Sequence, residues 1–560
     1  MTTHHLLRDS LPPSKAILQE WLDRQGIIRD AHLEIAEMDD GQSWRLVTRR
    51  DMYLGELVCA IPKTSILSHR TSALRPLPSD NSSGPSNLNG HTILHLSLCL
   101  LHEFRLGEES PFYGYLQSLP RETIPLPVFW NVPEIGGEDG KSARRWLEGT
   151  EAERELRIRD RDGLSLIDIQ AFYQTYSSHL PPTSTHPAPS SILSFYYCFS
   201  LVSTRAFMID IYHLIALCPF ADILNHSSIH ANTSLSSDDF VCHSCGSLKT
   251  CKHDITDSQG IAYRLHHLAR RDINRIEEDI DTIELRVESP IVQSGKEVWN
   301  SYGDAIGDGK LLVEWGFISQ EFAGEGLIWE LDDLTLSYRR SRAEEEDEQE
   351  EQRIWELIDR AAKVLTIGII HGSYRELDDG DSESEEDEKL LCGQSKVDAR
   401  LLNLDQSGRI SINMVGWAWF CITDEGSSAS TQWTKKANSE EGRIASENLI
   451  SAIKSLERLW THLSREEDDD DQDSAIPNDP AVDAPPSVLV NIVERISLLL
   501  RARLHKMYRS NKSEDELFDL RDSLDPEDNL QYMAMTISIN ERVLLRSALS
   551  RWDALSGYLH

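Results

Sequence analysis

Basic residues are scarce in this chain of 560 residues. Lys and Arg number 56 against 93 Asp and Glu, which gives a formal net charge of −37 at pH 7. A surface that binds nucleic acid needs clustered Lys and Arg to neutralise phosphates, so the composition argues against such a partner. The negative charge favours a basic protein partner through electrostatic steering, or it serves solubility alone.

Long apolar runs are also missing. No stretch of about 20 consecutive apolar residues occurs, so we expect no membrane-spanning segment. Residues Met1–Asp9 lack the apolar core of a signal peptide. We therefore expect a monomeric protein of the nucleus, the cytoplasm or both, with no membrane and no nucleic-acid partner.

Cysteines are few and form no regular disulfide framework. Six of the nine are scattered, mostly within apolar runs, which suits a reducing compartment; these are Cys59, Cys99, Cys198, Cys218, Cys392 and Cys421. The other three form the cluster Cys242-x2-Cys245-x5-Cys251-x-His253. These residue types suit structural zinc, with His253 as the fourth ligand and His243 or a distant His as alternatives. A surface hairpin with free thiols is the other interpretation.

The chain of 560 residues is too long for one core, so two or three domains are expected. Its first part mixes strands with helices. Alternating apolar residues predict strands at 33–37, 44–48 and 56–62, and again at 261–265, 282–287 and 297–299. Helical patterns at 15–26, 92–104, 141–180 and 191–207 supply the helices.

The character of the sequence changes after about residue 335. Acidic runs at 344–351, 378–388 and 466–473 alternate with helical patterns. The helical patterns cover 354–370, 443–463, 488–507, 514–523 and 530–555. We expect a separate all-helical domain whose acidic loops are disordered.

Two motif segments stand about 70 residues apart. The first is Leu217–Ser227, which contains Pro219-Phe220-Ala221-Asp222-Ile223-Leu224-Asn225-His226, and the second is Glu297–Gly303, followed by Leu311–Phe317. We interpret them as two halves of one active site.

The order of these motifs resembles that of the SET-domain protein-lysine methyltransferases of the Rubisco large-subunit methyltransferase type. The similarity rests on Ser203–Phe207 (with Thr204 inserted or substituted), Pro219–His226, Ser301–Gly303 with Leu311-Leu312 and Trp315–Phe317, Arg145–Thr150, and, near the C-terminus, Tyr508, Glu514–Glu516, Ala534 and Glu541–Leu545. The resemblance implies an α+β protein, in which a β-rich SET fold interrupted by a helical insert precedes an all-α substrate-binding domain. It places the SET domain at 15–335, with a helical insert at 91–210 and a Cys-rich insertion at 240–255, and the substrate-binding domain at 350–560.

The resemblance implies an S-adenosylmethionine-dependent enzyme that methylates lysine in a basic protein, plausibly ribosomal or chromatin-associated. Such an enzyme must position a neutral amine in line with a sulfonium methyl, and an apolar aromatic channel lowers the lysine pKa and favours the sulfonium charge. Tyr302 corresponds to the catalytic tyrosine, and Asn225, His226, Arg205, Trp44 and Tyr302 to cofactor contacts. Phe317, Trp315 and Arg205 correspond to the substrate pocket. The plainer alternatives are a core tyrosine, an Asn-His turn, a salt bridge for Arg205 and a core role for Phe317.

Three departures from the family pattern bear on catalysis. Ser43-Trp44-Arg45 stands where the family has a glycine-containing turn, Trp315 replaces a pocket tyrosine, and Asp308 replaces an asparagine. They leave open a catalytically weak interaction protein with a SET fold. A protein-histidine methyltransferase is a further alternative.

Overall fold

The computed structural model divides into two compact units. Unit 1 comprises 1–140, 155–306 and 310–321, and unit 2 comprises 141–154, 307–309 and 322–560. The residues described are 14–38, 44–74, 88–183, 190–238, 240–278, 280–303, 306–319, 321, 324–330, 333–334, 357–358, 361, 389–392, 400–424, 440–468, 483–526 and 530–560.

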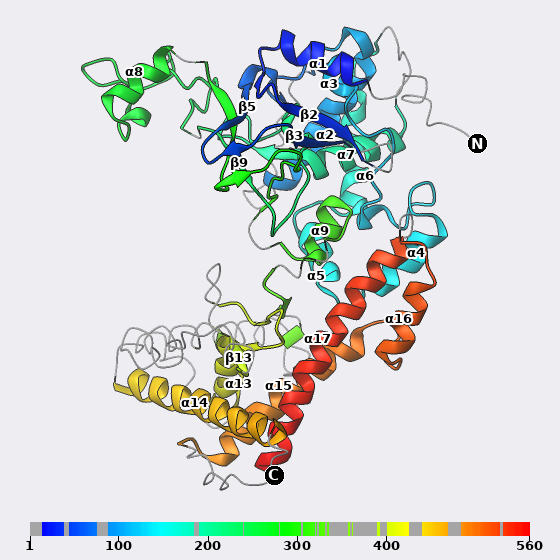
Figure 1. Ribbon diagram of the computed structural model, residues 1–560, viewed down its shortest axis with the longest axis vertical. Coiled ribbons are helices and arrows are strands. Elements are labelled where there is room, and N and C mark those ends of the chain that lie inside the picture. The colour runs from blue at the N-terminus through cyan, green and yellow to red at the C-terminus, as the bar shows by residue number, and fades with distance from the viewer. Residues whose placement is uncertain are drawn as a thin grey trace. The chain divides into compact units, whose positions relative to one another are not determined.

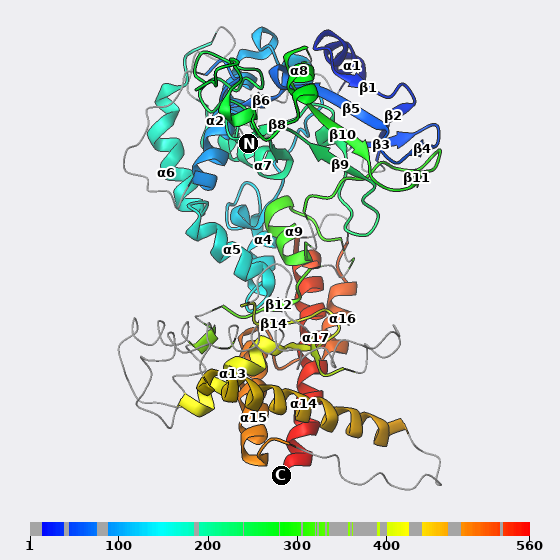
Figure 2. The same ribbon diagram turned by 90° about the vertical axis from the view of Figure 1, so that its left-hand side faces the viewer.

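The largest sheet of unit 1 is antiparallel and has the strand order β1-β5-β10-β9. Its strands are β1 (Ile28–Arg29), β5 (Leu57–Pro62), β10 (Thr282–Val287) and β9 (Thr233–Ser236), which lie side by side in Figure 2. Buried and half-buried residues alternate along β10, as expected for a strand with one face on the core. The predicted strands at 56–62 and 282–287 are therefore confirmed.

Smaller sheets complete the β part of unit 1. The predicted strands β2 (Leu33–Glu37) and β3 (Trp44–Thr48) pair antiparallel. Short strands form two further sheets, which are β4 (Met52–Tyr53) with β11 (Ile291–Val292), and β6 (Leu67–Ser68), β8 (Ile215–Leu217) and β7 (Ala206–Met208) in the order β6-β8-β7.

Helices of unit 1 share one hydrophobic core with these strands. The helix α1 (Lys15–Arg24) begins at Ser14, whose side chain accepts a hydrogen bond from the Ile17 N–H, and it buries Leu18, Trp21 and Leu22. The other helices are α2 (Leu88–Leu106), α3 (Tyr113–Leu116), α6 (Leu166–Tyr176) and α7 (Ile192–Arg205), and α2 packs against α7. The helices α4 (Gly137–Trp146), α5 (Glu151–Arg161) and α9 (Asp308–Trp315) each contribute residues to both units.

Two strand predictions are wrong in unit 1. Residues 261–265 contain the 3-10 helix Tyr263–Leu265, which belongs to the connection between β9 and β10, together with α8 (Arg270–Glu278). Residues 297–299 form no strand, although Glu297 bridges Val47.

Unit 2 is not all-helical, which corrects the sequence prediction. Four short strands form a sheet in the order β12-β14-β15-β13. They are β12 (Leu327–Ile328), β14 (Asn403–Leu404), β15 (Ile410–Ser411) and β13 (Leu391–Cys392).

Long helices nevertheless dominate unit 2, in yellow to red in Figure 1. They are α13 (Ile412–Asp424), α14 (Glu440–Asp468), α15 (Pro486–Lys506), α16 (Glu514–Asp522) and α17 (Leu530–Leu559), and α15 packs along α17. Apolar faces of α13, α14, α15 and α17 meet in a second core around Trp417, Leu456, Ile496 and Trp552.

Strands and helices together make the chain α+β, as predicted. The acidic runs 344–351 and 378–388, most of the run 466–473 and most of the predicted helix 354–370 lie outside the described residues. No helix in the described part of the chain has the length and hydropathy needed to cross a membrane.

Candidate active site

The turn that carries the first motif begins with an unusual backbone conformation. Phe220, with φ 77° and ψ −44°, follows β8 and leads into a 3-10 turn at Ala221–Ile223. An L-residue rarely adopts a positive φ, and such strain persists only where the surroundings hold it. Phe220 is 2% exposed, so the core fixes the turn that leads to Asn225 and His226.

The two motif segments pair directly, although about 70 residues separate them. The Asn300 N–H donates to the Asn225 carbonyl over 3.0 Å, and the Ser227 N–H donates to the Asn300 carbonyl over 3.2 Å. This short parallel ladder aligns His226 with Asn300 and sets Tyr302 beside the turn.

Tyr302 lies between two aromatic rings. Its ring stacks on His226 at a centroid distance of 4.9 Å and on Trp315, the last residue of α9, at 5.3 Å. Its hydroxyl donates to the Leu224 carbonyl over 3.2 Å. Burial raises the pKa of Tyr302 to about 12, so the hydroxyl keeps its proton at neutral pH.

His226 has a defined protonation state. Its Nδ1 accepts the Tyr302 N–H over 3.1 Å, which leaves the proton on Nε2, 3.1 Å from Ser228 Oγ. Burial lowers the pKa of His226, so the ring is neutral at physiological pH. Phe317 lies next to this ring, with a centroid distance of 6.3 Å.

Arg205 ends α7 and reaches the same turn. It donates from a terminal nitrogen to the Asp222 carbonyl over 2.7 Å, and its Nε is buried with no hydrogen-bond partner among the described residues. The Asp222 carboxyl accepts the Tyr115 hydroxyl over 2.7 Å, and burial raises the pKa of Asp222. The Asp222–Tyr115 pair is a buried support of the site that the sequence analysis did not single out.

A polar cluster surrounds Asn225. Its side-chain amide donates to Glu297 over 2.9 Å, and Arg45 of β3 approaches the other oxygen of this carboxylate at 3.7 Å. The Glu297 side chain is 11% exposed, and burial raises its pKa. Trp44 precedes Arg45 and packs, half-buried, against the main core. Glu297 begins the second motif segment, but the sequence alone indicates no role for it.

Glu321 is a second contribution that the sequence analysis missed. Its carboxylate accepts the Ser227 hydroxyl over 2.7 Å and the Ser228 N–H over 2.6 Å, and so secures the chain after His226. No motif marks Glu321. Asp308 is the first residue of α9, and Ser43 lies outside the described residues.

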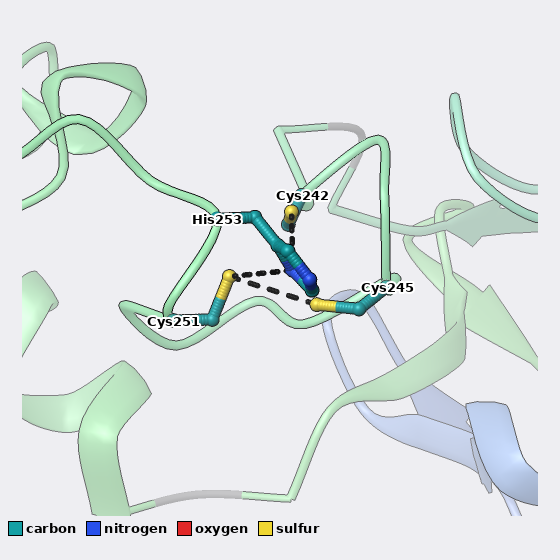
Figure 3. Close-up of side chains that lie close together, drawn as sticks. All are labelled: Cys242, Cys245, Cys251 and His253. Atoms are coloured by element: carbon teal, nitrogen blue, oxygen red, sulfur yellow. Dashed lines mark hydrogen bonds between the residues drawn. The ribbon is translucent and has the colours of Figure 1, made fainter.

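The predicted metal ligands also come together. One ligand atom each from Cys242, Cys245, Cys251 and His253 lies within 4.8 Å of the others, and the four side chains point toward one another in Figure 3. His253 is the histidine of this group, and His243 is not among its members. All nine cysteines are free thiols.

Comparison with known proteins gives relatives in sequence and in fold. No protein-family model matches the chain. The ribosomal lysine N-methyltransferase 3 of Saccharomyces cerevisiae is 22% identical over 424 residues, which are 67% of this chain and 71% of the yeast protein. The N-lysine methyltransferase SETD6 of Mus musculus is 26% identical over 234 residues, and the match spans 39% of this chain and 45% of the mouse protein.

Solved structures extend the likeness to nearly the whole chain. The SET domain of LSMT bound to lysine and AdoHcy has a TM-score of 0.50 at 13% identity, with 97% of this chain and 92% of that chain covered. Rubisco LSMT bound to AdoMet has a TM-score of 0.50 at 12% identity, with 98% and 93% covered. The fold comparison and the sequence relatives together confirm the resemblance to the SET-domain protein-lysine methyltransferases of the Rubisco large-subunit methyltransferase type. The named relatives are lysine methyltransferases, which is the enzyme class that the resemblance implies.

Proposed function

We propose that the chain transfers methyl groups from S-adenosylmethionine to lysine side chains of a protein, with Tyr302 as the catalytic tyrosine. The observation that carries the proposal is the pairing of the two motif segments, because it sets the Tyr302 hydroxyl at the Leu224 carbonyl and the Tyr302 ring against the rings of His226 and Trp315. The cofactor, when bound, supplies an electrophilic sulfonium methyl, whose bond to sulfur breaks as the bond to the lysine nitrogen forms.

The cluster around Asn225 fits the amino acid end of this cofactor, which carries an ammonium and a carboxylate. The buried carboxylate of Glu297 suits the ammonium, and a guanidinium suits the carboxylate. Arg205 retains an unpartnered Nε–H among the described residues, and Arg45 is exposed beside Glu297. We assign cofactor contact to Asn225, His226, Arg205, Trp44 and Tyr302.

Aromatic side chains provide the pocket that a lysine needs. Trp315 and Phe317 flank the Tyr302–His226 pair, and their apolar rings disfavour a charged ammonium that has lost its water. The high pKa of Tyr302 keeps its hydroxyl neutral, so no phenolate stabilises the protonated amine. The amine gives its proton to water before transfer, and the neutral hydroxyl and the Leu224 carbonyl then orient it.

The finer architecture and the partner belong to the same proposal. We assign the SET fold to 15–335, with its helical insert at 91–210 and its Cys-rich insertion at 240–255, and substrate binding to the helix-rich region 350–560. The formal charge of −37 supports a basic protein substrate, ribosomal or chromatin-associated, in the nucleus or cytoplasm.

A methyl-transfer assay with a matched pair of tyrosine variants tests the proposal. Purified chain is incubated with labelled S-adenosylmethionine and a basic protein extract. Tyr302→Phe removes the hydroxyl and keeps the ring, so we expect transfer to fall about 10²- to 10³-fold. Tyr53→Phe, at a side chain 52% exposed on β4, is the control and keeps full activity.

The outcomes separate the alternative functions. Mass spectrometry of the labelled peptides identifies methyl-lysine if the proposal is correct and methyl-histidine if the acceptor is histidine. Calorimetry is expected to show tight cofactor binding whether the acceptor is lysine or histidine. Binding without any transfer, equal for Tyr302→Phe and the unmodified chain, identifies a catalytically weak interaction protein.

A further inference from the structure

The connection between β9 and β10, residues 237–281, is too poor in apolar residues to fold by its own core. Among its described residues, a separate cluster contains only Ala262, Leu265 and Ile273, with Phe240, Ile261 and Leu268 packed against them. Segments of this length usually need a metal or disulfides to hold one structure. Its cysteines are free thiols, so the question is whether the ligand cluster has the geometry of a metal site.

Three of the six distances between the ligand atoms lie near those of a tetrahedral zinc site, and none of the six exceeds 4.8 Å. Zinc bonds of about 2.3 Å to sulfur and about 2.0 Å to nitrogen place tetrahedral ligand atoms roughly 3.5–3.8 Å apart. The Sγ atoms of Cys245 and Cys251 are 3.6 Å apart, and His253 Nδ1 is 3.7 Å from Cys251 Sγ and 3.9 Å from Cys242 Sγ. A disulfide would require an S–S distance of about 2.05 Å. Three thiolates and an imidazole are soft ligands, which select zinc over magnesium or calcium.

A half-buried ion pair supports the ligand loops from outside. Arg264 pairs with Asp254 at 2.8 Å, and the other oxygen of this carboxylate accepts the Cys251 N–H at 2.8 Å. The same guanidinium donates to the Phe240, Leu248 and Lys249 carbonyls over 2.7, 3.0 and 2.7 Å. Arg264 therefore ties together the two chain segments that carry the ligands, as the outer partners of a metal site do.

The loop that carries Cys242 and Cys245 also contacts the loop that joins β7 to β8. Gly246 follows the ligand Cys245, and a Cβ at Gly246 would lie 2.4 Å from the Tyr212 ring, so ring and backbone are in close contact. The loop that contains Tyr212 connects the end of the Ser203–Phe207 motif to the strand before Pro219–His226.

A second anchor lies where the insertion leaves and rejoins the sheet. Lys63, 4% exposed, donates to the Asp238 carbonyl over 2.9 Å and pairs with Asp281 at 3.2 Å and with Asp210 at 2.9 Å. Asp238 and Asp281 stand near the two ends of the insertion, and Asp210 stands in the β7–β8 loop. One buried ammonium thus joins both ends of the insertion to the loop that the ligand cluster touches.

We propose that Cys242, Cys245, Cys251 and His253 bind one structural Zn²⁺ ion, which holds the 237–281 insertion folded against the β7–β8 loop at residues 209–214. The ion takes no part in methyl transfer, because its ligands are not among the residues assigned to the reaction. Its role is to hold the β7–β8 loop in place from the side of the insertion. This loop lies between the Ser203–Phe207 and Pro219–His226 motifs.

Metal content and hydrogen exchange test the proposal on the full chain. Protein purified in reducing buffer is expected to retain about one zinc per chain by mass spectrometry of the metal. Cys245→Ser with Cys251→Ser abolishes retention, and His253→Ala lowers it. His253→Cys restores it, because four thiolates also form a tetrahedral zinc site. His243→Ala changes an exposed imidazole next to Cys242 and is the control, which keeps the zinc.

Removal of zinc by a chelator tests the second part of the proposal, that the ion holds the insertion against the β7–β8 loop. Removal of zinc from the unmodified chain is expected to speed amide exchange in the described residues of 240–265 and in 209–214, and to leave α2 unchanged. The metal site is overturned if the unmodified chain retains no more zinc than the double serine variant does. After the reductant is removed, a mass lower by two hydrogens that is absent from the double serine variant would show a Cys245–Cys251 disulfide instead. If the amide exchange rate at 209–214 does not change on chelation, the ion does not hold the insertion against the β7–β8 loop.

Discussion

At the scale of single residues, Phe220 combines a strained backbone conformation with a buried side chain. Its φ of 77° is one that L side chains adopt at a cost of about 1–3 kcal/mol. The side chain is nevertheless buried in the main core, where a Phe-to-Ala truncation typically costs about 3–5 kcal/mol. Packing therefore outweighs strain, and the strained turn directs the Leu224 carbonyl to Tyr302 and the Asp222 carbonyl to Arg205.

Paired substitutions of Phe220 test this balance. Both Phe220→Ala and Phe220→Gly lose the ring, so we expect each to lower the free energy of unfolding by about 2–5 kcal/mol. Glycine relieves the positive φ and alanine does not, so Phe220→Gly is expected to be about 1 kcal/mol more stable than Phe220→Ala. At an ordinary negative φ the order would be reversed. Urea denaturation of both variants measures the difference, and a more stable alanine variant would contradict the strain.

The motifs predicted the central residues of the candidate site but not the residues that support them. Tyr302, His226 and Asn225 carry the sequence signal, and the structure brings them together. Asp222 was quoted within its motif without a role, because its partner Tyr115 is 107 residues away. Glu321 reaches Ser227 across 94 residues and belongs to no motif. Contacts of this kind depend on the tertiary fold, which periodicity cannot supply.

At the scale of elements, the errors concentrate where strands are short or where a ligand cluster replaces a core. The alternation Ile261, Tyr263, Leu265 is typical of a strand, but the segment closes a loop beside the cysteine cluster, with Ala262 and Leu265 buried and Tyr263 exposed. The strands of the sheet in unit 2 have two residues each, which is too short to leave a periodic pattern. Long amphipathic helices, such as α15 and α17, were predicted to within a few residues.

Alanine substitutions at two glycines of the insertion distinguish the cost of backbone strain from that of steric contact. Gly246 and Gly260 have φ values of 70° and 78°, but a Cβ at Gly246 meets Tyr212 whereas one at Gly260 meets nothing within 4 Å. Gly260→Ala is expected to lower stability by about 1–2 kcal/mol from backbone strain alone. Gly246→Ala adds overpacking, so we expect a further loss of about 1–3 kcal/mol.

Hydrogen exchange within the insertion measures both glycine variants. Equal effects of the two substitutions would show that the Gly246–Tyr212 contact contributes nothing. Chelation is expected to reduce the difference between them, because the contact depends on the folded ligand loop.

At the scale of the whole molecule, the two units carry titratable groups whose pKa values are shifted in opposite directions by desolvation. In unit 1, burial lowers the pKa of both His69 and His95 to about 4, with their rings 5.5 Å apart and Arg70 and His91 nearby. In unit 2, burial raises the pKa of Glu541 to about 8. The Glu541 carboxyl accepts the Glu151 N–H over 3.0 Å, and the Glu151 carboxylate pairs with Arg503 at 2.7 Å.

These shifts predict opposite pH dependences for the two units. The unfolded state binds more protons than folded unit 1 at His69 and His95 between pH 4 and 6.5, so stability there is lost as the pH falls through this window. Folded unit 2 binds more protons at Glu541 between pH 4.5 and 8, so its stability is lost as the pH rises through that window.

Amide exchange, corrected for intrinsic rates, measures each unit by itself, with α2 reporting unit 1 and α17 reporting unit 2. Between pH 4.5 and 6.5 we expect protection to rise in α2 and to fall in α17. His95→Gln should reduce the first slope, because His69 still titrates, and Glu541→Gln should flatten the second. Each variant should leave the other helix unchanged. Parallel slopes in both helices, or slopes that these substitutions leave unchanged, would show that other groups control the pH response, since the two shifts have opposite signs only if burial dominates at these three side chains.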